Sequence, residues 1–124
     1  IEQYELADQV IVGSFHDSVL AHFRDICPSV PTSLGESEAT WLVVLSKFGL
    51  GHLYNSPGYS VQLPLVDSGI NIVTPSLVRA LHQLNMRVEV WTVNDTSTMQ
   101  ALIDMGVDGI ITDRPDRLMA LVSR

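Results

Sequence analysis

Short apolar runs alternate along the chain with longer segments in which apolar residues recur every three or four positions. A short β-branched run bounded by turn residues predicts a buried strand, whereas the longer recurrence predicts a helix with one apolar face. The predicted strands cover residues 10–12, 29–34, 60–63, 88–93 and 110–112. A helix or helix-like segment is expected after each strand, with apolar positions within 19–26, 39–50, 77–84, 99–103 and 118–122.

Two helix starts carry their own signals. Thr74 and Pro75 place a capping hydroxyl before a proline at the first helical position. Asp17 or Ser18 is expected to cap the first helix in a similar way.

The alternation of strands and helices predicts an α/β fold, because parallel strands need a crossover connection and a helix usually supplies it. The strands are short and mostly apolar, as expected for parallel strands covered on both faces. A TIM barrel and an open doubly wound sheet both fit this pattern, and periodicity alone does not separate them.

Composition excludes several classes of protein. The chain has 124 residues, of which 46% are hydrophobic and 17% charged, and this excludes a disordered chain. The formal net charge of −7 and the single lysine, Lys47, argue against nucleic-acid or anionic-membrane partners. The length is about half of the roughly 250 residues of a complete TIM barrel.

The expected compartment is the reducing cytoplasm. Cys27 is the only cysteine, so no intrachain disulfide can form. No apolar run is long enough to predict a transmembrane segment. The chain begins Ile1-Glu2-Gln3-Tyr4 without Met or a leader pattern, so we expect it to be part of a longer protein.

Candidate chemistry gathers where the predicted strands end, since functional groups of both candidate folds lie at the carboxyl ends of parallel strands. If Val88 and Val90 face the helices, strand alternation turns Glu89 and Trp91 to the opposite face. Gln62 is expected to face inward by the same rule, and an inward amide needs hydrogen-bond partners. Trp91 has two interpretations, a pocket wall or an ordinary core aromatic residue.

Other motifs give weaker signals. The four histidines lack metal-ligand spacing, and the Gly49-Leu50-Gly51 segment follows a helix rather than a strand, unlike a phosphate loop. Asn94 is expected to act as a helix cap or turn residue. Asp113 and Arg114 either cap the last helix and pair locally or help its N-terminus bind phosphate. Spacing alone therefore indicates only part of a parallel α/β fold.

Two late segments carry a family resemblance. The stretch 90–94 (VWTVN) and, twelve residues later, the stretch 106–115 (GVDGIITDRP) resemble the closing part of glycerophosphodiester phosphodiesterases. Ser14-Phe15 after a β-branched strand and Gln62-Leu63-Pro64 resemble middle strands of that family, in the expected order. The resemblance implies a phosphodiesterase-like TIM barrel, of which residues 1–124 would form the C-terminal five strand–helix units, strands four to eight.

The family resemblance also implies an activity. A complete member hydrolyses a small-molecule glycerophosphodiester to glycerol 3-phosphate and an alcohol, with a divalent metal, Mg or Ca, as Lewis acid and a His as general acid or base. The family's His-Arg-Gly, Glu-x-Asp, His-Asp and Glu-x-Lys segments have no counterpart here. The chain alone is therefore expected to bind no metal and to be inactive. The resemblance implies substrate-binding roles for Trp91, Gln62 and Phe15, and no catalytic or metal residue.

A non-catalytic half-barrel binding or interaction module is the alternative. In either case, five strands of a barrel leave open sheet edges with unpaired backbone groups. The chain is expected to pair through these edges with a copy of itself or with a missing N-terminal segment.

Overall fold

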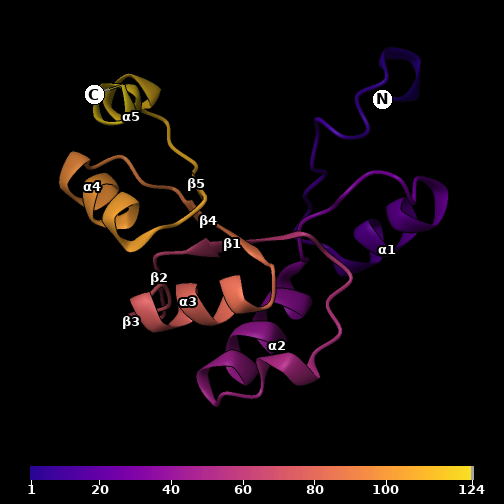
Figure 1. Ribbon diagram of the computed structural model, residues 1–124, viewed down its shortest axis with the longest axis horizontal. Helices are drawn as coiled ribbons and strands as arrows, with labels where there is room; N and C mark the ends of the chain where they lie inside the picture. The colour runs from indigo at the N-terminus through magenta and orange to yellow at the C-terminus, as the bar shows by residue number, and fades with distance from the viewer. Residues whose placement is uncertain (124) are drawn as a thin grey trace. The chain divides into compact units, whose positions relative to one another are not determined.

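The computed structural model describes residues 1–123 as a chain of helices and short strands that divides into two compact units. The first unit covers Ile1–Val61 and the second begins at Gln62 (Figure 1).

The first unit contains two α-helices and isolated parallel bridges. Its elements are η1 (Glu2–Tyr4), α1 (Asp17–Ile26), α2 (Glu36–Lys47), η2 (Gly51–Leu53) and the start of β1 (Ser60–Pro64). Single parallel bridges join Val12 to Thr32 and Ser33 to Ser60. The parallel direction agrees with the sequence pattern.

The predicted strands 10–12 and 29–34 are wrong in extent, since each reduces to bridge residues. The backbone N–H of Val12 donates to Pro31 at 3.0 Å, and Ser33 donates back to Val12 at 2.9 Å. Pro31 has no N–H of its own, so the ladder cannot continue through it. Ile11 is also left exposed.

The core of the first unit lies between its helices and the bridged segments. Its fully buried members include Leu20 of α1, Leu42 of α2 and Val61 of β1. The apolar stripe predicted on α1 is only partly buried, because Val19 and Ile26 remain more than half exposed.

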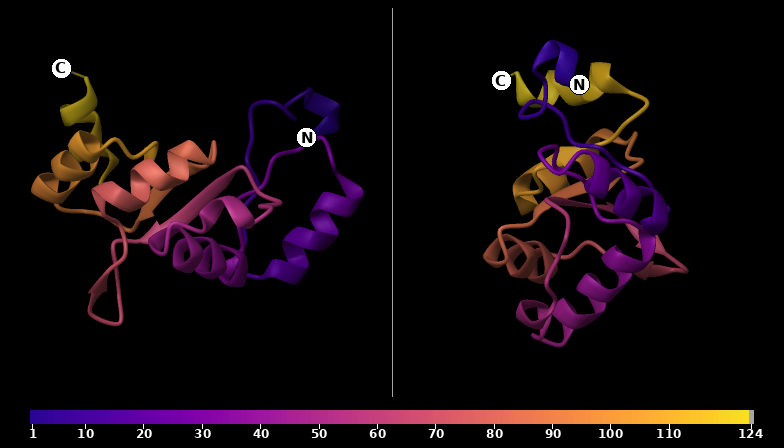
Figure 2. Two further views of the ribbon diagram at one scale, coloured as in Figure 1. Left: turned by 60° about the horizontal axis from the view of Figure 1, so that its bottom comes forward. Right: turned by 90° about the vertical axis from the view of Figure 1, so that its right-hand side faces the viewer.

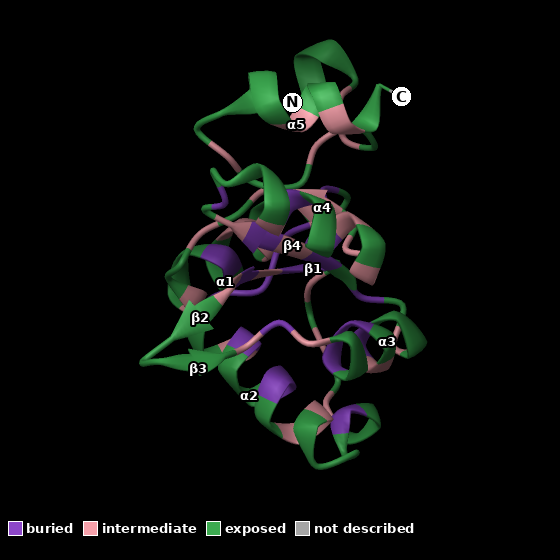
Figure 3. Ribbon diagram, turned by 90° about the vertical axis from the view of Figure 1, so that its left-hand side faces the viewer, coloured by how far each residue is buried: buried purple, intermediate pink, exposed green. Residues whose placement is uncertain are grey.

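The second unit is built around a three-stranded sheet with the order β1-β4-β5. β4 (Arg87–Trp91) and β5 (Gly109–Ile110) run parallel, with Glu89 opposite Gly109 and Val90 opposite Ile110. The helices are α3 (Pro75–Gln83), α4 (Thr96–Met105) and α5 (Pro115–Val122), and α3 packs against β4. Val88 and Val90 are fully buried, whereas Glu89 and Trp91 are half-buried, so the predicted alternation along β4 is confirmed (Figure 3).

The cap expected from Asp17 or Ser18 at α1 is wrong, because His16 holds that N-cap position without a side-chain hydrogen bond and the Asp17 carboxylate accepts from α2 instead.

Local capping starts α3 as the sequence predicts. The hydroxyl of Thr74 accepts a hydrogen bond from the N–H of Leu77 at 3.2 Å. At α4 the cap is Asp95, whose carboxylate accepts from the Thr98 N–H at 2.9 Å. Hydrogen bonds from Ser97 and Thr98 lower the pKa of Asp95 to about 2. Gly106 ends α4 with φ 85°, in the left-handed region that favours glycine.

Asp108 ties three elements of the second unit together. Its carboxylate accepts from the Val88 N–H at 2.8 Å and lies 2.9 Å from the His82 ring nitrogen Nε2. Burial alone would raise the pKa of Asp108, but the hydrogen bonds from Val88 and His82 outweigh it and lower the pKa. The carboxylate thereby joins α3, β4 and the approach to β5.

A short hairpin follows β1 that the sequence pattern did not predict. β2 (Val66–Asp67) and β3 (Ile70–Asn71) pair antiparallel around Ser68 and Gly69, which have φ of 50° and 79°. Two successive positive φ angles are typical of a tight hairpin turn. Figure 2 shows this hairpin projecting from the rest of the second unit.

The α/β class with parallel strands is therefore confirmed. Within residues 1–123, no helix is long and apolar enough to cross a membrane.

Candidate functional site

Gln62 and Glu89 meet on one face of the three-stranded sheet. The side-chain nitrogen Nε2 of Gln62 donates to Oε2 of Glu89 at 2.8 Å. Both side chains are half-buried, while their strand neighbours Val61, Leu63 and Val88 are buried on the opposite face. The predicted inward amide thus has a carboxylate partner on the adjacent strand.

Gly109 makes room for this pair. Glu89 stands opposite Gly109 in the parallel register, and a Cβ at Gly109 would lie 3.0 Å from Cγ of Glu89. Such a distance is tighter than ordinary van der Waals contact, so a larger residue would require the Glu89 side chain to shift by a few tenths of an ångström. Glycine at position 109 leaves Glu89 where it is.

Trp91 ends β4 two residues after Glu89, so alternation puts both side chains on the same face. It is half-buried, and its peptide bond to Thr92 is cis. The structure thus brings Gln62, Glu89 and Trp91 to one face of the second unit. Phe15, the third predicted substrate-binding residue, belongs to the first unit and is 63% exposed there. Its position relative to Gln62 and Trp91 is not determined.

Asn94 links the two loops that follow β4 and β5. Its Oδ1 accepts from the Thr112 hydroxyl and from the Asp113 N–H, both at 2.9 Å, and its Nδ2 donates to the Asp113 carboxylate at 3.0 Å. Asp95, not Asn94, caps the following helix. Asn94 is therefore a loop-joining residue, a role that the sequence could not give because Asp113 lies 19 positions away.

Arg114 does not pair with Asp113. Its guanidinium makes two hydrogen bonds to Asp116, at 3.0 and 2.7 Å, and both side chains are largely exposed. The expected local pairing is present between Arg114 and Asp116, whereas the carboxylate of Asp113 accepts from Asn94 instead. The expected cap is wrong, because the side chain of the N-cap residue Arg114 makes no capping hydrogen bond at the start of α5.

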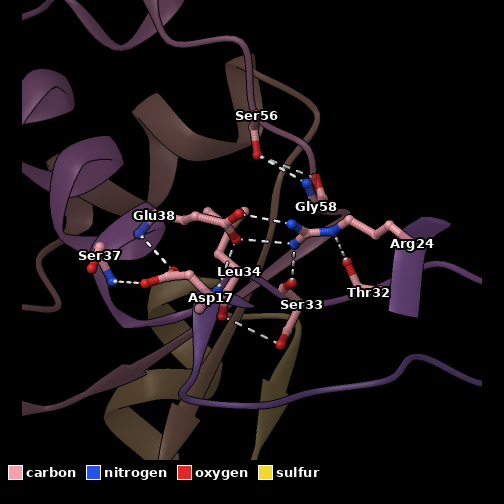
Figure 4. Close-up of polar contacts among 10 residues, drawn as sticks. Asp17, Arg24, Thr32, Ser33, Leu34, Ser37, Glu38, Ser56 and Gly58 are labelled. Carbon is pink, nitrogen blue, oxygen red and sulfur yellow. Dashed lines mark hydrogen bonds and ion pairs between the residues drawn. The ribbon is translucent and has the colours of Figure 1, made fainter. Parts of the chain in front are cut away.

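A second polar cluster, which sequence analysis missed, lies in the first unit (Figure 4). Arg24 of α1 donates from Nη1 to Glu38 Oε1 at 2.7 Å and from Nη2 to Oε2 at 3.0 Å. It also donates to the Thr32 hydroxyl at 2.8 Å and to the Ser33 carbonyl at 3.0 Å. Both ionic side chains are more than four-fifths buried. This ion pair joins α1, α2 and the bridged segment.

A cavity of about 390 Å³ adjoins this ion pair and is lined by Arg24, Pro28, Thr32, Pro57, Tyr59 and neighbouring residues. The Arg24 donors that reach it are already engaged by Glu38, Thr32 and Ser33. The guanidinium therefore acts as a structural tie, and we assign no ligand to the cavity.

Asp17 replaces a missing cap at the start of α2. Gly35 holds the N-cap position and has no side chain, so the carboxylate of Asp17 accepts instead from the N–H groups of Ser37 and Glu38, both at 3.3 Å. A Cβ at Gly35 would contact Oδ1 of Asp17 and come within 3.0 Å of its Cα. The sequence signal was Gly35 followed three residues later by Glu38, which accepts from the Gly35 N–H at 3.0 Å.

This arrangement shifts the pKa values of Asp17 and Tyr54. Burial would raise the pKa of Asp17, but hydrogen bonds from Ser37 and from the Glu38 N–H outweigh it and lower the pKa below 3.8. Burial and the negative charges of Glu38 and Asp17 raise the pKa of Tyr54.

We expect Asp17→Asn to lower the stability of the first unit at pH 7 by about 0.5 kcal/mol, because asparagine keeps one of the two acceptor oxygens and complete loss of a helix cap typically costs about 1 kcal/mol. Because the pKa is lowered on folding, ionised Asp17 stabilises the fold above pH 3.8, and this stabilisation is lost as pH falls through the lower folded value. The difference between wild type and variant should therefore shrink below about pH 4. Urea unfolding at pH 7, 5 and 3, followed by Trp41 fluorescence, measures it.

Asp25→Asn is the matched control for Asp17→Asn, since Asp25 is exposed on the same helix. It should leave the pH 7 midpoint unchanged. A difference between wild type and Asp17→Asn that stays constant from pH 7 down to pH 3 would contradict the capping role.

The residues that the structure describes do not fit a metal site. Among residues 1–123, no group of three or more His, Cys, Asp or Glu side chains is arranged to hold a metal ion. We therefore assign no chemical step in this chain to a metal.

Known proteins resemble this chain in both sequence and structure. The sequence model of the glycerophosphoryl diester phosphodiesterase family matches residues 2–117. A glycerophosphodiester phosphodiesterase of Bacillus altitudinis is 30% identical over 98% of this chain and 46% of its own length. A probable glycerophosphodiester phosphodiesterase 2 of Mycobacterium tuberculosis is 48% identical over 58 residues, 47% of this chain and 22% of that protein.

Solved structures agree with the sequence relatives. The crystal structure of a glycerophosphoryl diester phosphodiesterase homologue from Silicibacter pomeroyi matches 98% of this chain and 40% of its own, with 25% identity and a TM-score of 0.72. A glycerophosphodiester phosphodiesterase from Parabacteroides distasonis matches 98% of this chain and 46% of its own, with 26% identity and a TM-score of 0.69. The chain spans less than half the length of each of these proteins. Because the family model covers nearly all of its residues, the chain belongs to the glycerophosphoryl diester phosphodiesterase family.

Proposed function

We propose that the chain forms the substrate-pocket half of a glycerophosphodiester phosphodiesterase, an enzyme that hydrolyses glycerophosphodiesters to glycerol 3-phosphate and an alcohol. The observation that carries this proposal is the family match over residues 2–117. The chain by itself is proposed to be inactive. The match to less than half the length of the relatives supports this second part.

The proposed architecture is strands four to eight of a TIM barrel. Parallel pairing of β4 with β5 and the parallel bridges of the first unit support it, as does a match to about half the length of the relatives. β5 lies at an edge of its sheet. We propose that this edge pairs with the remaining strands of the domain or with a copy of the chain.

The proposed roles of the chain's residues concern binding. Trp91 would line the pocket beside the glycerol moiety, and Gln62 and Phe15 would contribute further wall. A divalent cation would supply Lewis-acid chemistry from a site made by other residues. The free Cys27 suits a cytoplasmic, reducing compartment.

A hybrid enzyme tests this proposal. In the Bacillus altitudinis relative, the segment that aligns with this chain is replaced by residues 1–124. We expect the hybrid to release glycerol 3-phosphate from glycerophosphocholine in the presence of Mg or Ca. The chain alone should release none under the same conditions.

The parent relative is the positive control for the hybrid. A hybrid that is folded and monodisperse but inactive, beside an active parent, would overturn the enzymatic proposal and favour a non-catalytic half-barrel module. Activity of the chain alone would overturn the proposal that residues outside this chain are required for hydrolysis.

A further inference from the structure

The carboxylate of Glu89 fixes which way the Gln62 amide points. An ionised carboxylate can only accept hydrogen bonds, whereas a carboxamide has one accepting and one donating end. The 2.8 Å contact to Glu89 Oε2 must therefore be made by the NH₂ group of Gln62. The amide oxygen Oε1 is thereby turned away from Glu89 and left to accept from another group.

Gly109 leaves room for this arrangement on the other side. Glu89 lies between Gln62 on β1 and Gly109 on β5, and a Cβ at position 109 would come within 3.0 Å of the Cγ of Glu89. The hydrogen bond from Gln62 therefore fixes the carboxylate at a place where the neighbouring strand carries no side chain.

Within the part of the chain that the structure describes, no cation forms an ion pair with Glu89. The ion pairs among residues 1–123 are Arg24–Glu38, His82–Asp108 and Arg114–Asp116. A carboxylate without a cation repels phosphate and favours donors such as hydroxyl groups. The face formed by Gln62 and Glu89 thus offers two oxygen acceptors to a ligand and no positive charge.

We propose that Glu89 is a positioning residue that orients Gln62 to accept a hydroxyl group of the polyol end of the substrate and keeps the phosphate away. This inference rests on the proposed function, because it divides a glycerophosphodiester into a hydroxyl-bearing end and a charged end. Trp91, on the same face, contacts the carbon skeleton of the polyol. Glu89 therefore sets the direction in which the substrate lies.

The first test uses the 124-residue chain and nuclear magnetic resonance of side-chain amides. Glycerol, sn-glycerol 3-phosphate and inorganic phosphate are the probes. We expect glycerol and glycerol 3-phosphate to shift the Gln62 amide and Trp91 indole resonances, and inorganic phosphate to shift neither. In Glu89→Gln the selectivity against phosphate should disappear. The negative charge of residue 89 is then gone, and the side-chain amide of Gln62 can rotate by half a turn and present its NH₂ group.

Asp104→Asn provides a matched control. Gln100 donates to Asp104 at 2.8 Å, the same chemistry as Gln62 and Glu89, but on the exposed surface of α4. This variant should leave all Gln62 shifts unchanged. A Gln62 shift with inorganic phosphate as large as that with glycerol, or no Gln62 shift with any probe, would overturn the proposal.

The second test uses the hybrid enzyme. Glu89→Gln should raise KM for glycerophosphocholine about three- to tenfold, the value of one hydrogen bond, and change kcat less than twofold. The exchange variant, Gln62→Glu with Glu89→Gln, restores a donor–carboxylate pair and should recover most of the KM. A purely structural role would lower the urea midpoint without this recovery.

The two proposals fail in different ways. An active hybrid whose KM is unaffected by Glu89→Gln rejects the positioning role and leaves the enzymatic function standing. An inactive hybrid would reject the enzymatic function. If glycerol but not phosphate still shifts the Gln62 amide resonances of the chain, the proposal that Glu89 orients Gln62 toward a polyol is retained.

Discussion

Arg24→Met is expected to destabilise the first unit by about 2 to 3 kcal/mol. Removing one partner of a buried ion pair typically costs 3 to 5 kcal/mol, and we reduce that value because both side chains keep some contact with water. The variant leaves the Glu38 carboxylate without its cation and the Ser33 carbonyl without its Nη2 donor. Methionine keeps most of the aliphatic part of the arginine side chain, so the loss of stability measures the contribution of the charge and the hydrogen bonds.

Urea unfolding with two fluorescent reporters measures this effect. The chain has two tryptophans, Trp41 in α2 and Trp91 in β4, so each unit carries one. The midpoint seen by Trp41 should fall for Arg24→Met. The double variant Arg24→Met with Glu38→Leu should recover a substantial part of the lost stability, because replacing both members of a buried pair with apolar residues is often neutral.

Arg114→Met is the matched control for Arg24→Met. Arg114 makes the same two-pronged contact with Asp116, but the two side chains are 44% and 62% exposed. An exposed pair contributes little, so no change in either midpoint is expected. Equal effects of Arg24→Met and Arg114→Met would show that burial does not govern the strength of the Arg24 pair.

Sequence periodicity predicts local structure in this chain better than it predicts contacts. The helix start at Thr74 and Pro75 and the alternation of Val88 with Glu89 follow from rules that act within a few residues. Pro31 is also visible in the sequence, yet its effect on the Val12 bridge depends on which segment pairs with it. The strands predicted at 10–12 and 29–34 are too long because Pro31 lacks the N–H that would extend their pairing.

The candidate site shows the same division. Strand alternation places Gln62 and Glu89 on inward faces, but the bond between them depends on the register of β1 against β4. Asp17 caps a helix that starts 19 residues later, and no local motif records such a contact. The Ser68-Gly69 turn was the exception: its dipeptide was a local signal, but its two strands are too short to show an alternating pattern.

Trp91→Ala in the hybrid enzyme is expected to lower kcat/KM for glycerophosphocholine about tenfold to thirtyfold. A tryptophan covering roughly 60 to 80 Å² of ligand carbon would contribute about 1.5 to 2 kcal/mol, which corresponds to that range. Trp91→Phe should retain most of the activity, because it keeps an aromatic face. Steady-state hydrolysis with glycerophosphocholine as substrate gives both values.

The two interpretations of Trp91 predict different pairs of measurements. A pocket wall gives a loss in kcat/KM with a small change in the urea midpoint, whereas a core aromatic residue gives a large fall in the midpoint with an unchanged KM. Trp41→Ala is the control, since Trp41 is 61% exposed on α2 and has no proposed contact with substrate. Because Trp91 is half-buried and shares its face with Gln62 and Glu89, we expect the first pattern.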